Sequence, residues 1–215
     1  MSVKAKDQEL LKLNKLIADG LFDDAISYVN ELTLSSPVKN FNVGYIMFNQ
    51  KQYVEARVFL ERAQFGGMLS KETDDALSLV KEKLEITAIE NEFSRTDDFI
   101  LNSASLPAET IPAIALLGCV IFLISAWKKR FFPLVLSVMS LMTVCFVYYS
   151  VKDLEVKFNQ EDNIVYRGPS RIFEELQVLP KGVKFITSKE SQDWTFIKYP
   201  AMYSGWIYKN KAIKL

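Results

Sequence analysis

Apolar side chains recur at intervals of three and four residues along the first part of the chain. The spacing is clearest at residues 10–17 and 22–32. This is the spacing of one face of an α-helix. Breaks rich in glycine, serine and proline separate the helical segments: Asp19-Gly20, Ser35-Ser36-Pro37 and Gly66-Gly67. The pattern predicts an all-α array of short helices over residues 1–95.

Two long apolar runs follow, at residues 111–127 and 131–151, and neither contains a charged residue. As helices they would be about 26 and 31 Å long, which is close to the hydrocarbon thickness of a bilayer. They predict a two-helix transmembrane hairpin over residues 111–151. Because no ionisable group lies within the runs, the hairpin is expected to be an anchor rather than a transport pathway.

From residue 162 onward the period changes from that of helices to that of strands. Five short apolar segments are separated by glycine and proline turns, and the segment Trp194–Tyr199 alternates apolar and polar residues. The pattern predicts a small all-β barrel over residues 162–215. The polar segments 96–110 and 152–161 are expected to be linkers.

Composition narrows the chemistry that this chain can perform. It holds 26 basic and 26 acidic residues, so the overall charge does not favour nucleic-acid binding. It has no histidine, and both cysteines, Cys119 and Cys145, fall in the apolar runs. With no phosphate-binding loop and no nucleophile elbow either, we expect no enzyme activity, no metal and no cofactor. Acidic pairs such as Asp23-Asp24 are expected to be solvated surface.

Charge also suggests an orientation for the predicted hairpin. The turn Lys128, Lys129 and Arg130 is a compact cationic cluster, and short cationic loops stay in the cytoplasm. This predicts a two-pass protein of the bacterial inner membrane, with residues 128–130 as topology determinants and both soluble domains in the periplasm. The first ten residues carry no apolar signal segment. A lost signal, export of the N-terminal domain as a tail, and the inverted topology therefore stay open.

The helical segment contains an internal repeat with an offset of 31 residues, from Ala25 to Ala56. Together with Pro37 and Gly44, the repeat resembles the tetratricopeptide family. The resemblance implies a concave groove for protein segments. Three polar residues are expected to contact a partner there: Asn42, Asn49 and Arg57. An unrelated helical bundle is the alternative. In either case the aromatic residues of these helices are expected to be core.

The C-terminal segment carries turn and aromatic residues in the order Gly168-Pro169-Ser170, Lys181-Gly182, Trp194 and Gly205-Trp206-Ile207. This order resembles the bacterial SH3 domain. The resemblance implies a module that binds a peptide or a cell-wall fragment. Trp194 and Trp206 are expected to be core rather than surface. The surface candidates are four tyrosines: Tyr166, Tyr199, Tyr203 and Tyr208.

The three parts in this order resemble the BatE proteins of bacterial aerotolerance operons. That resemblance implies a non-enzymatic membrane scaffold with a role in envelope integrity and oxidative-stress tolerance. The implied partners are von Willebrand A-domain Bat proteins and, indirectly, a MoxR-type AAA+ ATPase; peptidoglycan and the lipid bilayer are further candidates. The alternative hypothesis is an envelope enzyme, or an activator of a membrane-associated enzyme.

Overall fold

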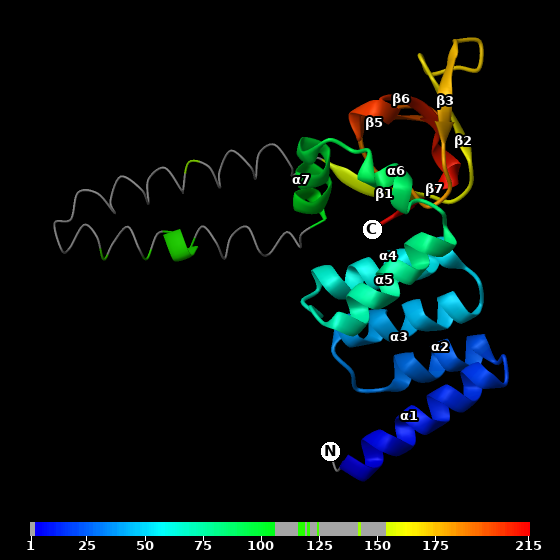
Figure 1. Cartoon of the computed structure of the whole chain (residues 1–215), viewed down its shortest axis with the longest axis vertical. Helices are drawn as coiled ribbons and strands as arrows, with labels where there is room; N and C mark the ends of the chain where they lie inside the picture. Colours follow the sequence, from blue (N-terminus) through cyan, green and yellow to red (C-terminus); the bar gives the residue numbers. More distant parts are fainter. Residues whose placement is uncertain (1–2, 106–115, 119, 121–123, 125–141, 143–153) are drawn as a thin grey trace.

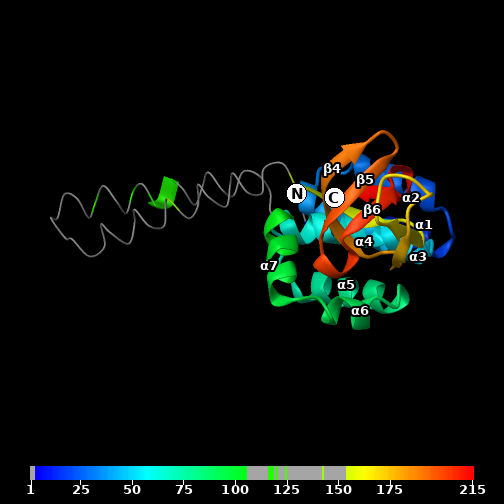
Figure 2. The same cartoon turned by 90° about the horizontal axis from the view of Figure 1, so that it is seen from above.

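The computed structural model describes residues 3–105 and 154–215, together with residues 116–118, 120, 124 and 142. Helices make up the first of these ranges and a β-sheet makes up the second. In Figure 1 the helices of residues 3–83 are stacked below the sheet, the later helices lie at the level of the sheet, and the C-terminus lies between the stack and the sheet. Seen from above, the strands overlie the helices of the stack (Figure 2).

Five helices form the N-terminal stack, and each packs against the one before it. They are α1 (Val3–Ala18), α2 (Phe22–Glu31), α3 (Ser36–Asn49), α4 (Tyr53–Phe65) and α5 (Lys71–Lys83). Helix α3 begins with Pro37 in its first turn, where a missing N–H costs nothing. The Ser70 hydroxyl caps α5 by accepting from the Thr73 amide at 3.4 Å.

Small residues allow α3 and α4 to approach closely. Ala56 is fully buried, and a Cβ built on Gly44 would lie 2.8 Å from Leu60 Cγ. Ala25 is fully buried in the same way on α2. The alanines of the sequence repeat therefore mark helix contacts too close for a larger side chain.

Two further helices follow the stack, α6 (Thr87–Asn91) and α7 (Arg95–Ala104). The Ser94 hydroxyl caps α7 by accepting from the Asp97 amide at 3.0 Å. Helix α7 occupies most of the segment 96–110, which was predicted to be a linker. Its polar composition hides an apolar side, on which Leu101 is buried against the sheet.

The sheet contains seven strands in the order β3-β2-β6-β5-β4-β1-β7, and every pairing is antiparallel. Its members are β1 (Glu155–Asn159), β2 (Asn163–Tyr166), β3 (Glu175–Leu179), β4 (Lys184–Ser191), β5 (Trp194–Tyr199), β6 (Gly205–Tyr208) and β7 (Ala212–Lys214). Short 3-10 helices, η1 (Ala201–Tyr203) and η2 (Lys209–Lys211), flank β6. Strand β1 comes from the segment 152–161, which was also expected to be a linker.

The core of the sheet includes side chains from the helices. Strand residues such as Val165, Phe185 and Ile197 are fully buried there. Ile86 before α6, Phe93 after it and Leu101 of α7 belong to the same apolar cluster. The sheet and the helices after α5 therefore share one core.

The predicted fold class needs correction at its C-terminal end. A small five-strand SH3-like barrel was predicted over residues 162–215, whereas the structure has a seven-stranded sheet that begins with β1. The physical reason is the shared core, because the apolar face of the sheet is covered by Ile86, Phe93 and Leu101. These contacts connect residues far apart in the chain.

The predicted membrane protein is corrected as well. Among the residues that the structure describes, no helix combines the length and the apolar character that crossing a bilayer requires. This finding overturns the two-helix hairpin as part of the fold and the two-pass inner-membrane localisation drawn from it. The apolar runs 111–127 and 131–151 lie almost entirely outside the described residues, and so does the turn 128–130.

Candidate functional site

A buried network of ion pairs joins the helical stack to the sheet. Arg57 of α4 is only 1% exposed, and its guanidinium lies 2.9 Å from Glu61 and 2.7 Å from Glu90. The same guanidinium donates to the Gly182 carbonyl, just before β4, at 2.8 Å. Its carbon also lies 5.1 Å from the ring centre of Phe158 on β1. The guanidinium therefore has two carboxylates, one backbone carbonyl and one aromatic ring as partners.

Glu61 links the same helix to the sheet a second time. Its carboxylate lies 2.9 Å from Lys184 Nζ on β4. Burial by itself would raise the pKa of Glu61, but Lys184 and Arg57 outweigh that effect and lower the pKa to about 2. For Arg57, burial favours the neutral form, and the neighbouring Glu61 and Glu90 reverse this and raise its pKa. Arg57 and Glu61 are therefore both charged at neutral pH.

This network is structural. Arg57 was predicted to contact a partner in the repeat groove, but the structure encloses it between α4 and the sheet, where no partner reaches it. Its charge is compensated by Glu61 and Glu90, and Lys81 completes the network 2.9 Å from Glu90. Within residues 3–105 and 154–215, no three acidic or cysteine side chains gather into a possible metal site.

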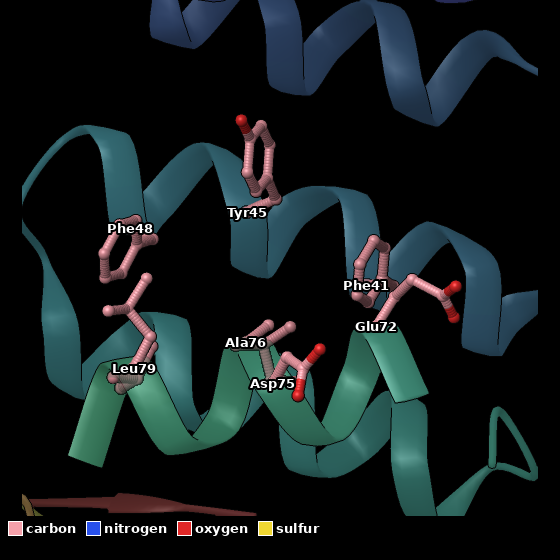
Figure 3. Close-up of a pocket in the computed structure, with 9 residues that line it drawn as sticks. Phe41, Tyr45, Phe48, Glu72, Asp75, Ala76 and Leu79 are labelled. Carbon is pink, nitrogen blue, oxygen red and sulfur yellow. The ribbon is translucent and has the colours of Figure 1, made fainter. Parts of the chain in front are cut away.

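The first open site is an apolar groove between α3 and α5, with a volume of about 310 Å³. Figure 3 shows its two walls. Phe41, Tyr45 and Phe48 project from α3 at helical spacing, and Leu79 faces Phe48 from α5. Tyr45 and Leu79 are 46% and 43% exposed, so the groove offers apolar surface to solvent. The buried side chains of Leu60 and Val80 form its floor.

One end of this groove is acidic. Glu72 and Asp75 of α5 line it at the end where Phe41 lies (Figure 3). Hydrogen bonds from its own backbone amide and from the Ser70 hydroxyl lower the pKa of Glu72, so this carboxylate is ionised at neutral pH. The groove therefore combines an aromatic wall with a fixed negative end.

The two predicted asparagines lie beside the groove and do not line it. Asn42 Nδ2 donates to the Val38 carbonyl at 2.8 Å, and Asn49 Nδ2 donates to the Tyr45 carbonyl at 2.8 Å. Both amides thus bond to their own helix. Phe41 and Tyr45, which do line it, were expected to be core because they are aromatic. The signal that could have found them is the spacing of Phe41, Tyr45 and Phe48, which places all three on one side of α3.

The second open site is an aromatic pocket of about 260 Å³ on the sheet. Trp194 of β5 lies between Tyr166 of β2 and Tyr208 of β6. Its ring centre is 5.4 Å from Tyr166 and 5.7 Å from Tyr208, and both contacts are edge-to-face. The Arg171 guanidinium lies 5.8 Å from the ring of Tyr208. The remaining lining residues are mostly polar: Asp162, Asn163, Ile164 and Lys211.

Two of the four predicted surface tyrosines meet in this pocket, Tyr166 and Tyr208. The other two lie elsewhere. Tyr203 is 6% exposed and packs edge-on against Phe93 at 6.4 Å, while Tyr199 is half-buried at the edge of the sheet core. Trp194, expected to be core, lines the pocket and is half-buried.

Trp206 is half-buried too, and its ring lies 5.4 Å from that of Phe196. The predicted topology determinants Lys128, Lys129 and Arg130 lie outside the described residues.

Comparison of the chain with protein-family models, with curated proteins and with solved structures gives no match.

Proposed function

We propose that this chain is a non-catalytic adaptor that binds a protein segment in the groove between α3 and α5. One observation carries the proposal: a partly exposed aromatic wall, Phe41, Tyr45 and Phe48, ends at two carboxylates, Glu72 and Asp75. Exposed apolar surface of this kind is costly unless something covers it. The groove also runs between two helices, which is the arrangement that accepts an amphipathic helix.

The charges of the groove define its ligand further. Glu72 and Asp75 favour a lysine or arginine on the bound segment, placed one or two turns from its apolar anchors. The described helical part is acidic overall, with 17 acidic and 12 basic residues among residues 1–105. A cationic segment is therefore attracted over a longer range as well. We expect an amphipathic helix with leucine or phenylalanine on one face and basic residues on the other.

The test uses a labelled amphipathic peptide of leucine and lysine, about 14 residues or four turns long. A leucine–glutamate peptide of the same pattern serves as the counterpart. Fluorescence anisotropy should show that the full chain binds the lysine peptide and not the glutamate peptide. Neutralising the acidic end with Glu72→Gln and Asp75→Asn should raise Kd about tenfold, because two charge interactions are lost.

A matched control keeps the test specific. Asp23 and Asp24 form a similar exposed acidic pair in the first turn of α2, away from the groove. Asp23→Asn with Asp24→Asn should leave Kd unchanged. Equal weakening by both double variants, or equal binding of both peptides, would show only non-specific attraction and would refute the groove as a site.

A second function is favoured by the aromatic pocket. Its edge-to-face rings, with Arg171 and Lys211 beside them, suit an extended proline-containing peptide that carries an acidic residue. Titration with such a peptide should release heat for the full chain and much less for Arg171→Gln. Binding of peptidoglycan fragments in its place would reassign the pocket to sugars. The Bat proteins and the MoxR-type ATPase stay predictions as partners.

A further inference from the structure

Strand β3 forms one edge of the sheet, because it pairs only with β2. An edge strand presents unpaired backbone N–H and C=O groups, which template pairing with another strand. Edges are often protected by lysine or proline within the strand. The five residues of β3, Glu-Leu-Gln-Val-Leu, include neither. In Figure 1 this edge lies on the side of the sheet away from α7, so none of the labelled helices covers it.

The hairpin that carries this edge is unusually apolar on its surface. Val178 is 53% exposed, and it pairs in register with Ile164, which is 36% exposed. Residues paired in register project from the same face. Leu176 is 41% exposed and Ile172, in the connecting loop, is 89% exposed. We call Ile164, Ile172, Leu176 and Val178 the β3 patch.

The charges around the patch are self-complementary. Glu175 and Lys181 lie three residues before and three residues after Val178, and both are exposed. Neither takes part in an ion pair within residues 154–215, whereas the adjacent Glu174 lies 2.8 Å from Arg167. A strand with an acid at its start and a base just beyond its end matches a reversed copy of itself.

We infer that two copies of this chain associate through β3, antiparallel, with the twofold axis at Val178. In this register Glu175 of each copy faces Lys181 of the other, and the two Val178 side chains meet at the axis. A symmetric dimer uses the same surface twice, as a closed twofold interface requires. The pairing satisfies the free edge and brings the two β3 patches side by side on one face of a continuous sheet. It leaves the α3–α5 groove open, so this inference stands independently of the proposed function.

Charge exchange tests the register. Sedimentation equilibrium of the full chain should show a dimer, and Glu175→Lys alone or Lys181→Glu alone should weaken dimerisation about tenfold, because like charges then face each other twice. The double variant E175K/K181E should restore it, since each pair is only inverted. Asp193→Lys, on an exposed turn of the same sheet, should have no effect. Association through any other surface would not follow this exchange, and failure of the double variant to recover overturns the register.

Cysteine cross-linking provides a second measurement that needs no charge change. In a Cys119→Ser, Cys145→Ser background, Val178→Cys should form an intermolecular disulfide, because Cβ atoms of directly opposed residues lie about 5 Å apart. Ile164→Cys, one strand further from the axis and on the same face, should not. A chain that remains monomeric up to about 1 mM, with Val178→Cys uncross-linked, overturns the proposal and leaves β3 to a strand of another protein.

Discussion

Arg57 and Gly182 show how single residues join the helices to the sheet. Arg57 of α4 donates to the Gly182 carbonyl at 2.8 Å. Gly182 has a φ of +84°, and a Cβ built on it would lie 2.7 Å from a methyl group of Leu84. Glycine meets both demands at once: it tolerates the left-handed backbone and lets Leu84 pack against it.

Gly182→Ala should therefore be destabilising on two counts. The left-handed backbone costs a non-glycine residue about 1–2 kcal/mol, and the contact with Leu84 adds to that unless the side chain moves. Gly20→Ala is the matched control, because Gly20 has a φ of +72° and nothing lies within 4 Å of its Cβ position. Urea unfolding should show a larger loss for Gly182. Equal losses would mean that Leu84 relaxes freely.

The carboxylate of Glu61 should make stability depend on acid. Its pKa falls from 4.5 to about 2 on folding, so it stabilises the folded chain above pH 4.5, and the contribution is lost as the pH falls toward 2. The shift corresponds to roughly 3 kcal/mol. Glu61→Gln should lower the free energy of unfolding at pH 7 and flatten its fall between pH 4.5 and 3. The exposed Glu82→Gln should change neither, and an unchanged acid profile for Glu61→Gln would contradict the network.

The pairing of α3 with α4 shows how sequence and packing act at the level of the element. Gly44 lies in the interior of α3, where glycine is a poor helix former. It is tolerated because its missing side chain lets α4 approach: a Cβ there would lie 2.8 Å from Leu60 Cγ and 3.2 Å from the Ala56 carbonyl oxygen. Packing therefore outweighs propensity at this position.

The sign of the stability change caused by Gly44→Ala tests whether packing outweighs helix propensity at this position. In an unhindered helix interior the change would stabilise by about 1 kcal/mol. Here overpacking should reverse the effect and destabilise by roughly 1–2 kcal/mol. Ser27→Ala, on the exposed side of α2, should be neutral or slightly stabilising by thermal unfolding. A rise in Tm for Gly44→Ala would show that the two helices have room to separate.

At the scale of the whole molecule, the sheet depends on the helices before it. Ile86, Phe93 and Leu101 belong to its core, and Val54 and Val58 of α4 pack against Phe158 on β1. The ion network around Arg57 crosses the same junction. The described helices and strands should therefore unfold together.

A fragment of residues 162–215, the expected boundaries of the SH3-like domain, should fail to fold. It lacks β1, which pairs with both β4 and β7, and it lacks the three helical side chains that close the core. Its amide proton spectrum should be poorly dispersed, while the full chain should retain the signals of a folded sheet. A well-dispersed spectrum of the fragment would show that the sheet is self-sufficient.

The positions of most helices and strands could be read from the sequence. Residues 3–83 carry helices between the predicted breaks, and β5 and β6 lie on the predicted segments. Helix α7 and β1 were missed, although each has a local signal: the Ser94 cap before α7, and alternating Val156 and Phe158 in β1. Both were overlooked because their segments are polar on average, and an average conceals a single apolar face.

The binding sites could be predicted only in part, for a related reason. Tyr166 and Tyr208 were singled out and do meet in the aromatic pocket, but Arg57 was expected at the surface and is enclosed. The buried charge of Arg57 is stabilised by partners that lie far along the chain. Glu90 and Gly182 are 33 and 125 residues away. No local pattern indicates such contacts.

Local order in this protein thus follows from the sequence alone, because periodicity, caps and glycine turns act over a few residues. Tertiary structure decided which faces met. It placed the helices after α5 over the sheet, enclosed Arg57 and Lys184 with their carboxylates, and left the α3–α5 groove and the β3 edge uncovered. Those outcomes depend on long-range burial and charge pairing, whose energies exist only once distant segments are in contact.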